Sequence, residues 1–181
     1  MTISAEQLNK LKFPIGPFAP KENISQTELD EFIKTIKSAP AAYRAITENL
    51  SDSDFNKTYR EGAWTVRQLV NHLADMHLLH FFRMKKALTE PDYKEITLVD
   101  IPAWANTADC TNYPVADSLD ILDAITRRYV HLIKSLSEAQ LAIAYYHPVR
   151  KITLNQKQAV QMTAWHVRHH LEHIKIALGR S

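Results

Sequence analysis

Glycine is scarce in this sequence, with only three residues among 181. Glycine-rich phosphate loops and tight β-hairpins both use glycine where the backbone must adopt positive φ or approach a ligand closely. The scarcity therefore disfavours nucleotide-binding loops and hairpin-rich folds, and it suits long helices. Most of the eight prolines fall between the candidate helices, where they favour irregular connections.

Cysteine, net charge and long apolar runs are also limited. The sequence has a single cysteine, Cys110, which excludes an intramolecular disulfide and fits a reducing cytoplasm. Cys110 lies in a polar stretch, which gives little support for a catalytic thiol. A formal net charge of +2 gives no reason to expect nucleic acid or an anionic membrane as a partner. No segment has the roughly 20 apolar residues of a membrane span. The length predicts one domain over residues 1–181.

Four long segments carry apolar residues at helical spacing. They begin near Ser25, at Thr65, after Pro114 and after Asn155, and they end near Leu50, Leu88, Leu136 and Gly179. Three of the starts have the capping-box pattern, in Ser25–Glu28, Thr65–Gln68 and Asn155–Gln158. Pro40 interrupts the first segment, so a kink or break is expected near Ser38–Ala39.

The remaining segments read as connections. Residues 1–24 form an irregular arm with a possible short helix over 5–12, and residues 51–64 form a connector. Residues 91–114 are long enough to cross between distant helices or to act as a lid. A short extended piece is expected at 151–154. The sequence therefore predicts an all-α fold, a four-helix bundle with one long crossover connection.

Histidines cluster in the fourth helical segment, with four of the nine between His166 and His173. Helical residues turn by about 100°, so all four share one side, and Val167 and Ile174 mark the neighbouring core-facing stripe. His166 and His170 border that stripe one turn apart, where two imidazoles can bind one metal ion. We expect His169 and His173 to be solvated or to stand behind the ligands.

A catalytic zinc site usually has three protein ligands and an open position. His72 is the best third candidate by position, because it borders the core stripe of the second helical segment. His80 points more squarely into the core and is expected to be a hydrogen-bonded structural residue. The other histidines, His77, His131 and His147, are expected in solvent. Asp75 either orients a ligand imidazole or is an ordinary exposed carboxylate.

A rival grouping lies within the same cluster. His169, Glu172 and His173 match the H-x-x-E-H pattern of inverzincin proteases, with Glu172 as the general base. Such a short pattern is easily met by chance among clustered histidines. It also requires His169 and His173 to point inward, against the apolar stripe.

The motifs taken together resemble the YfiT-like branch of the DinB superfamily of metal-dependent hydrolases, whose relatives include bacillithiol S-transferases. The matching segments are Phe13–Gly16, Tyr59–Gln68, His72–His77, Arg83–Glu90, Ala103–Trp104, Arg127–Arg128, His147–Pro148 and Ala164–His170. The chain departs from the branch at Ala63, where glycine is more frequent, and at Val149, where an acidic residue is frequent.

This resemblance implies a bundle with an up-down-down-up order and a tendency to form homodimers. It also implies one divalent metal ion per chain, zinc first and nickel second, held by His72, His166 and His170. The implied activity is that of a metal-dependent hydrolase or a thiol S-transferase acting on a small molecule.

The chemistry of such an ion permits both reactions, because it can activate a bound water or a bound thiol. The sequence identifies no catalytic base and does not decide between them. The alternative function class is a non-catalytic helical bundle whose metal site is structural or adventitious.

Overall fold

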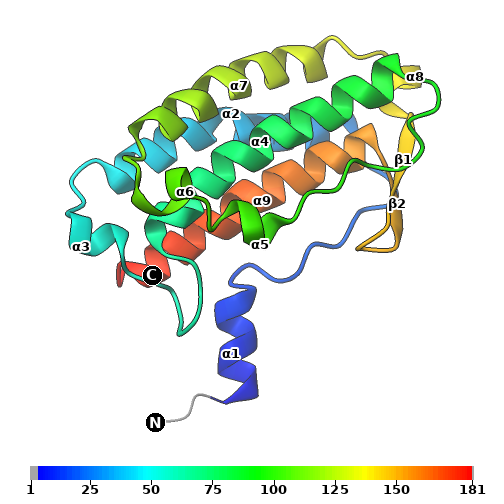
Figure 1. Cartoon of the computed structure of the whole chain (residues 1–181). Coiled ribbons are helices and arrows are strands. Elements are labelled where there is room, and N and C mark those ends of the chain that lie inside the picture. The colour runs from blue at the N-terminus through cyan, green and yellow to red at the C-terminus, as the bar shows by residue number, and fades with distance from the viewer. Residues whose placement is uncertain (1–3, 181) are drawn as a thin grey trace.

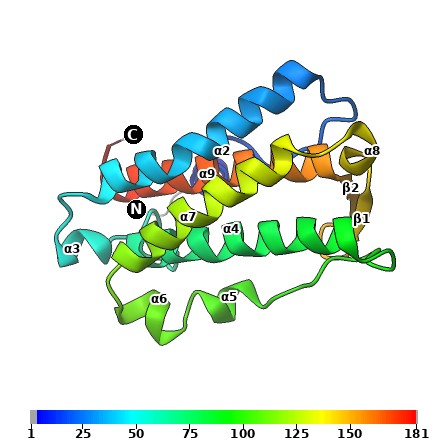
Figure 2. The same cartoon turned by 90° about the horizontal axis from the view of Figure 1, so that it is seen from above.

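The computed structural model describes residues 4–180 and is built around four long helices. These are α2 (Gln26–Thr47), α4 (Val66–Thr89), α7 (Ala116–Lys134) and α9 (Gln156–Ala177). In Figures 1 and 2, α2 and α9 run in one direction along the bundle, and α4 and α7 run in the other. The predicted four-helix bundle with an up-down-down-up order and one long crossover is therefore confirmed.

The helix starts follow the capping residues. Ser25, Thr65 and Asn155 each accept a hydrogen bond from the backbone N–H three residues later, and the residue at that position bonds back to the cap. These bonds satisfy donors that have no partner within the helix. Of the kink or break expected near Ser38–Ala39, the break is wrong, because α2 continues through Pro40. Burial of Ile36 and Tyr43 on either side of the proline stabilises the helix despite one missing backbone hydrogen bond.

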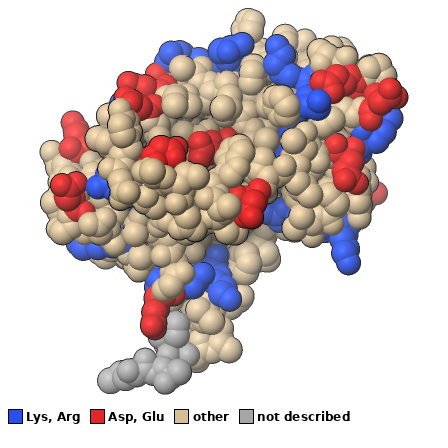
Figure 3. All heavy atoms as spheres, in the orientation of Figure 1, with Lys and Arg blue, Asp and Glu red and all other residues tan. Residues whose placement is uncertain are grey.

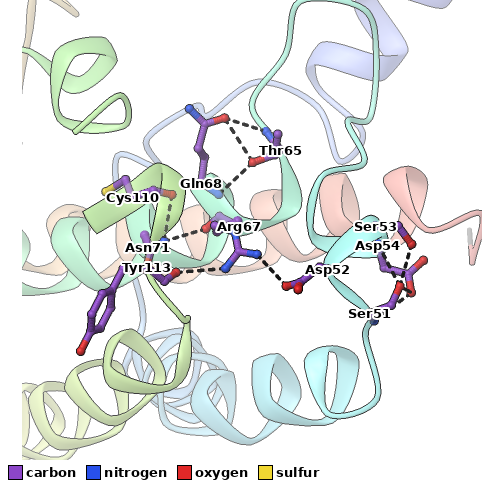
Figure 4. Close-up of polar contacts among 10 residues, drawn as sticks. All are labelled: Ser51, Asp52, Ser53, Asp54, Thr65, Arg67, Gln68, Asn71, Cys110 and Tyr113. Atoms are coloured by element: carbon purple, nitrogen blue, oxygen red, sulfur yellow. Dashed lines mark hydrogen bonds and ion pairs between the residues drawn. The ribbon is translucent and has the colours of Figure 1, made fainter. Parts of the chain in front are cut away.

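The crossover between α4 and α7 contains two short helices, α5 (Ile101–Trp104) and α6 (Ala108–Asn112). Side chains of α4 hold it in place. The Gln68 amide donates to the Ala105 carbonyl over 2.8 Å, and the Asn71 amide donates to the Cys110 carbonyl over 3.1 Å (Figure 4). Arg67 donates to the Tyr113 carbonyl over 3.0 Å and pairs with Asp52. The crossover is thus hydrogen-bonded along its length and packs on α4.

Short elements complete the chain. They are α1 (Ala5–Lys12), α3 (Asp52–Phe55), α8 (Glu138–Leu141), and the antiparallel strands β1 (Ala144–His147) and β2 (Ile152–Asn155). The short helix over 5–12 is as predicted, whereas the extended piece expected at 151–154 has a partner strand. The turn between the strands places Lys151 at a φ of 54°, so this hairpin forms without the glycine that such turns favour.

The core fills the space between the four long helices. Its largest fully buried apolar side chains are Tyr43, Tyr129, Ile36, Leu69, Leu73, Met84, Leu122, Ile133, Leu154 and Ile174. Within the described residues, no helix is long and apolar enough to cross a membrane. On the face shown in Figure 3, lysine and arginine are interspersed with aspartate and glutamate. That face carries no continuous basic surface for a nucleic acid.

Candidate metal centre

Three histidines from two helices converge inside the bundle. His72 lies on α4, and His166 and His170 lie one turn apart on α9, with one ring nitrogen from each of the three within 4.8 Å of the others. The Nε2 atoms of His72 and His166 are 3.1 Å apart. Because α4 and α9 pack against each other, residues 94 positions apart in the sequence share one small volume.

This arrangement fits a divalent metal ion. Zinc–nitrogen bonds of about 2.0–2.1 Å in a tetrahedral site place neighbouring ligand nitrogens roughly 3.3 Å apart. The 3.1 Å between His72 and His166 is close to that separation. A set of imidazoles without carboxylates suits zinc, nickel or copper better than magnesium or calcium.

The electrostatics of the three rings also suit metal binding, which needs neutral imidazoles. Burial lowers the pKa of His72 to about 3. Burial also holds the pKa of His166 and of His170 well below the usual range, with repulsion between the clustered histidines as a further cause. All three rings are therefore uncharged near neutral pH, and their lone pairs are available.

A cavity of about 270 Å³ opens on the three histidines. Its other lining residues are Phe13, Trp64, Met76, His80, Arg83, Ile101, His147, Arg150, Met162, Trp165 and His169. The lining is mostly aromatic, apolar and histidine, and it includes two arginines. None of the described residues that line it is an aspartate or glutamate. The cavity is thus electropositive before any metal binds.

The two arginines act on the neighbouring histidines. Burial and then the positive charges of Arg83 and Arg150 lower the pKa of His147 to about 4. Arg83 is only 7% exposed, and its guanidinium donates through Nε and Nη2 to the carbonyl of Thr97. Among the described residues neither arginine pairs with a carboxylate. Their charge is therefore free to act on a ligand in the cavity.

His169 and His173, which the sequence predicted to lie either in solvent or behind the metal ligands, are not in solvent. His169 is 6% exposed and His173 is 2% exposed. The ring of Trp165 stacks on His169 at 4.3 Å, and the ring of Tyr59 stacks on His173 at 3.9 Å. The helical-wheel argument fails here because segments outside the bundle cover this side of α9.

The structure supports the rival protease-like grouping only in part. His169, His170 and His173 also bring one ring nitrogen each within 4.8 Å of one another. Glu172, however, bonds to Lys175 over 2.7 Å and is absent from that group. The pattern that would make Glu172 a general base is therefore not assembled.

Among the other histidines, the predicted environment is confirmed for His80 and His131 but not for His77 and His147. His80 is hydrogen-bonded to Thr163 over 3.0 Å, as expected of a structural residue, and also lines the cavity. His131 is exposed, as expected. The expectation that His77 lies in solvent is wrong, because it is 0% exposed. His147 is half-buried at the cavity and not fully solvated.

The carboxylate and the thiol near the cluster have no direct contact with it. Asp75 is half-buried, and its carboxylate lies 3.8 Å from Sγ of Cys110. Among the described residues no hydrogen bond joins Asp75 to a histidine ring, so it does not orient a ligand. Burial raises the pKa of Cys110, which makes this thiol a poor nucleophile.

With this geometry in view, comparison with known proteins identifies the family. A family model described as the DinB superfamily matches residues 35–174. The chain belongs to the DinB superfamily.

Relatives within the DinB superfamily align over nearly the whole chain. YfiT of Bacillus subtilis is 35% identical over 164 residues, covering 91% of this chain and 92% of YfiT. A Bacillus pumilus protein is 35% identical over 174 residues, covering 96% of this chain and 98% of the relative. Both are provisionally named as metal-dependent hydrolases.

Solved structures agree with the DinB assignment. The structure of B. subtilis YfiT, described as a probable metal-dependent hydrolase with an unusual four-helix bundle topology, superposes with a TM-score of 0.88 and 33% identity, and covers 95% of this chain and 99% of YfiT. A mycothiol-dependent maleylpyruvate isomerase superposes with a TM-score of 0.64 at 16% identity, covering 84% of this chain and 67% of the isomerase. The second likeness concerns the fold alone.

Sequence reasoning missed three features of this DinB cavity. Arg83 and Arg150 were not selected as site residues, and Trp64, whose ring lies 4.7 Å from that of His72, was noted only within a motif. Arg83 offered one signal, since it directly precedes the core residue Met84 within an apolar helix. The sequence around Arg150 carries no such signal, because its place at the cavity depends on how the β1–β2 hairpin packs.

Proposed function

We propose that this protein is a metal-dependent enzyme in which His72, His166 and His170 hold one divalent metal ion per chain, zinc first and nickel second. The observation that carries the proposal is the convergence of three neutral imidazoles at the wall of one cavity. Three protein ligands leave at least one coordination position for water or substrate. When bound, such an ion lowers the pKa of a coordinated water or thiol and makes it a nucleophile at neutral pH.

The cavity favours thiol S-transfer over hydrolysis. Metal-dependent peptide hydrolases of the H-E-x-x-H type place a carboxylate next to the metal as general base, and none of the described lining residues is acidic. Arg83 and Arg150 instead add positive charge, which stabilises a thiolate relative to a thiol. We therefore place a low-molecular-weight thiol as the first substrate and a small electrophile as the second.

The fold is compatible with such a reaction, since one protein of similar fold is mycothiol-dependent. Hydrolysis of a small ester or amide is the second candidate, because the close relatives carry that provisional name. A non-catalytic bundle with a structural or adventitious metal is the alternative from another class.

The chain's own residues would contribute orientation and exclusion of water. Phe13, Trp64 and Trp165 supply aromatic walls beside the three histidines. Apolar walls strengthen electrostatic interactions inside the cavity because they displace water. The arginines would hold an anionic part of the substrate against the same wall. We further propose, from the family resemblance, that the protein forms a homodimer, which light scattering would test.

The first experiment measures metal content in protein purified without a histidine tag. We expect about one divalent ion per chain, and His72→Ala, His166→Ala and His170→Ala should each lose most of it. His131→Ala is the matched control, since its ring is exposed on α7. Retention of the ion by all three variants would contradict the proposed site.

The second experiment separates the reaction classes. The metal-loaded protein is assayed with glutathione or cysteine and a generic electrophile, and in parallel with activated ester and amide substrates. Turnover that requires the thiol and disappears in His170→Ala supports S-transfer. Thiol-independent turnover of the ester or amide supports hydrolysis. No turnover in any assay, with the metal retained, favours the non-catalytic bundle.

A further inference from the structure

Two buried histidines outside the proposed ligand set lie next to it without an assigned role. The rings of His169 and His173 lie next to that of His170, with centroids 4.9 Å and 5.4 Å from it, and His173 is among the fully enclosed side chains of the protein. A buried polar ring costs free energy unless its nitrogens are hydrogen-bonded. The partners of His173 therefore indicate what it does.

The Nε2 atom of His173 lies 3.1 Å from the carbonyl oxygen of Leu11. A carbonyl oxygen only accepts, so Nε2 must carry the proton and donate it. Leu11 stands in the last turn of α1 (Ala5–Lys12), where carbonyl groups have no partner within the helix. The contact satisfies both groups and joins the N-terminal helix to the histidine cluster.

The protonation of Nε2 decides what the other nitrogen of His173 can do. A neutral imidazole with a proton on Nε2 has a bare Nδ1. That Nδ1 lies 3.3 Å from Nδ1 of His170, so His170 must be the donor of this hydrogen bond. His170 then carries its proton on Nδ1, and its Nε2 is left with the free lone pair.

We propose that the Leu11 carbonyl and His173 form a hydrogen-bond relay that fixes the tautomer of His170 and presents its Nε2 to the metal ion. The proposal rests on the proposed function, because it assumes that His170 is a ligand. His173 is then a positioning residue. Metal-binding histidines commonly donate their second ring nitrogen to another group, which fixes the tautomer and orients the ring.

Further contacts keep the relay in place. The Tyr59 ring stacks on His173 at 3.9 Å with an angle of 9° between the planes. The arm beyond α1 is tied to the same side of α9, since the indole of Trp165 donates to the Gly16 carbonyl over 3.1 Å. In Figure 1, α1 stands outside the bundle. The relay therefore gives this helix a role that its separate position does not otherwise explain.

The relay also accounts for the second histidine group. His169, His170 and His173 are close enough to hold an ion, but the relay uses Nδ1 of His170 and Nδ1 of His173 for each other. Nδ1 of His170 carries the proton and Nδ1 of His173 accepts it, so neither nitrogen is available to a second ion. The expected stoichiometry is one metal ion per chain, not two.

The direct test is the tautomer of each ring in the metal-free protein. Nitrogen-15 NMR of histidine-labelled protein at mildly alkaline pH distinguishes a protonated from a bare ring nitrogen. We expect a proton on Nδ1 of His170 and on Nε2 of His173. A proton on Nε2 of His170 overturns the proposal. Since no metal is present, this result is independent of whether the protein is an enzyme.

Variants test whether the relay matters for metal binding. His173→Leu removes both hydrogen bonds, and we expect metal affinity to fall about 10–100-fold, the usual cost of losing such a partner. His173→Gln keeps an acceptor for His170 and a donor for Leu11, so it should retain most of the affinity. His77→Leu is the matched control, because His77 is equally buried and lies outside the relay.

The outcomes separate this inference from the proposed function. If His173→Gln binds as weakly as His173→Leu, His173 acts through packing and the relay is wrong. Two ions per chain, with the second lost in His169→Ala, would make the outer group a metal site and also overturn the relay. If His170→Ala keeps the metal, the proposed site fails, whereas the NMR result on the metal-free protein still stands separately.

Discussion

Acid should destabilise this protein in part through His77, a residue that the mechanism does not use. His77 lies on α4 with 0% exposure, and neither ring nitrogen has a hydrogen-bond partner among the described residues. Burial lowers its pKa from 6.5 to about 4. The native state therefore takes up this proton at lower pH than the unfolded chain does, and protonation favours unfolding.

The sign and size follow from that difference. The stability that depends on a neutral His77 is fully present above pH 6.5. It declines as the pH falls and is lost once the pH reaches about 4. A difference of about 2.5 pKa units corresponds to about 3 kcal/mol, of which about 2 kcal/mol is already lost at pH 5. That is a large part of a typical stability of about 5–15 kcal/mol.

Urea unfolding of the metal-free protein at pH 7.5 and pH 5 tests this reasoning. In His77→Leu the free energy of unfolding should fall less between the two pH values than in the unchanged protein, by about 2 kcal/mol. At pH 7.5 the variant should be at least as stable, because leucine replaces an unpartnered polar ring of similar size. His131→Leu, whose ring is exposed on α7, serves as the control. An equal loss in His77→Leu and the unchanged protein would refute the argument.

Two further predictions concern the crossover and the cavity. Gln68→Leu removes the buried hydrogen bond to the Ala105 carbonyl, and urea unfolding should show a free energy of unfolding lower by about 1–3 kcal/mol. Gln26→Leu, at an exposed position, is the control. A change below about 0.5 kcal/mol in Gln68→Leu would contradict the anchoring role. In steady-state assays, Arg150→Gln should raise KM for a carboxylate-bearing thiol more than for the neutral amide of that thiol, because the positively charged arginine lines the cavity. Equal effects on both thiols would exclude an electrostatic role.

Local sequence determined the long helices and the three candidate metal ligands, His72, His166 and His170. Capping pairs such as Ser25 with Glu28 act within one turn, so their effect is independent of the rest of the chain. The spacing of His166 and His170 likewise places both rings together on any helix. Their partnership with His72 came from its position beside the apolar stripe of another helix, and the structure brings the three rings together.

Contacts between distant segments decided the remainder. His169 and His173 are polar residues on the far side of the apolar stripe, and the arm, Tyr59 and Trp165 cover them. Arg150 reaches the cavity because the β1–β2 hairpin folds beside it. Periodicity reports how a helix faces its own core, whereas burial depends on every segment that packs against it. The sequence by itself thus determined the bundle and the candidate ligands, and the tertiary structure decided which neighbours surround them.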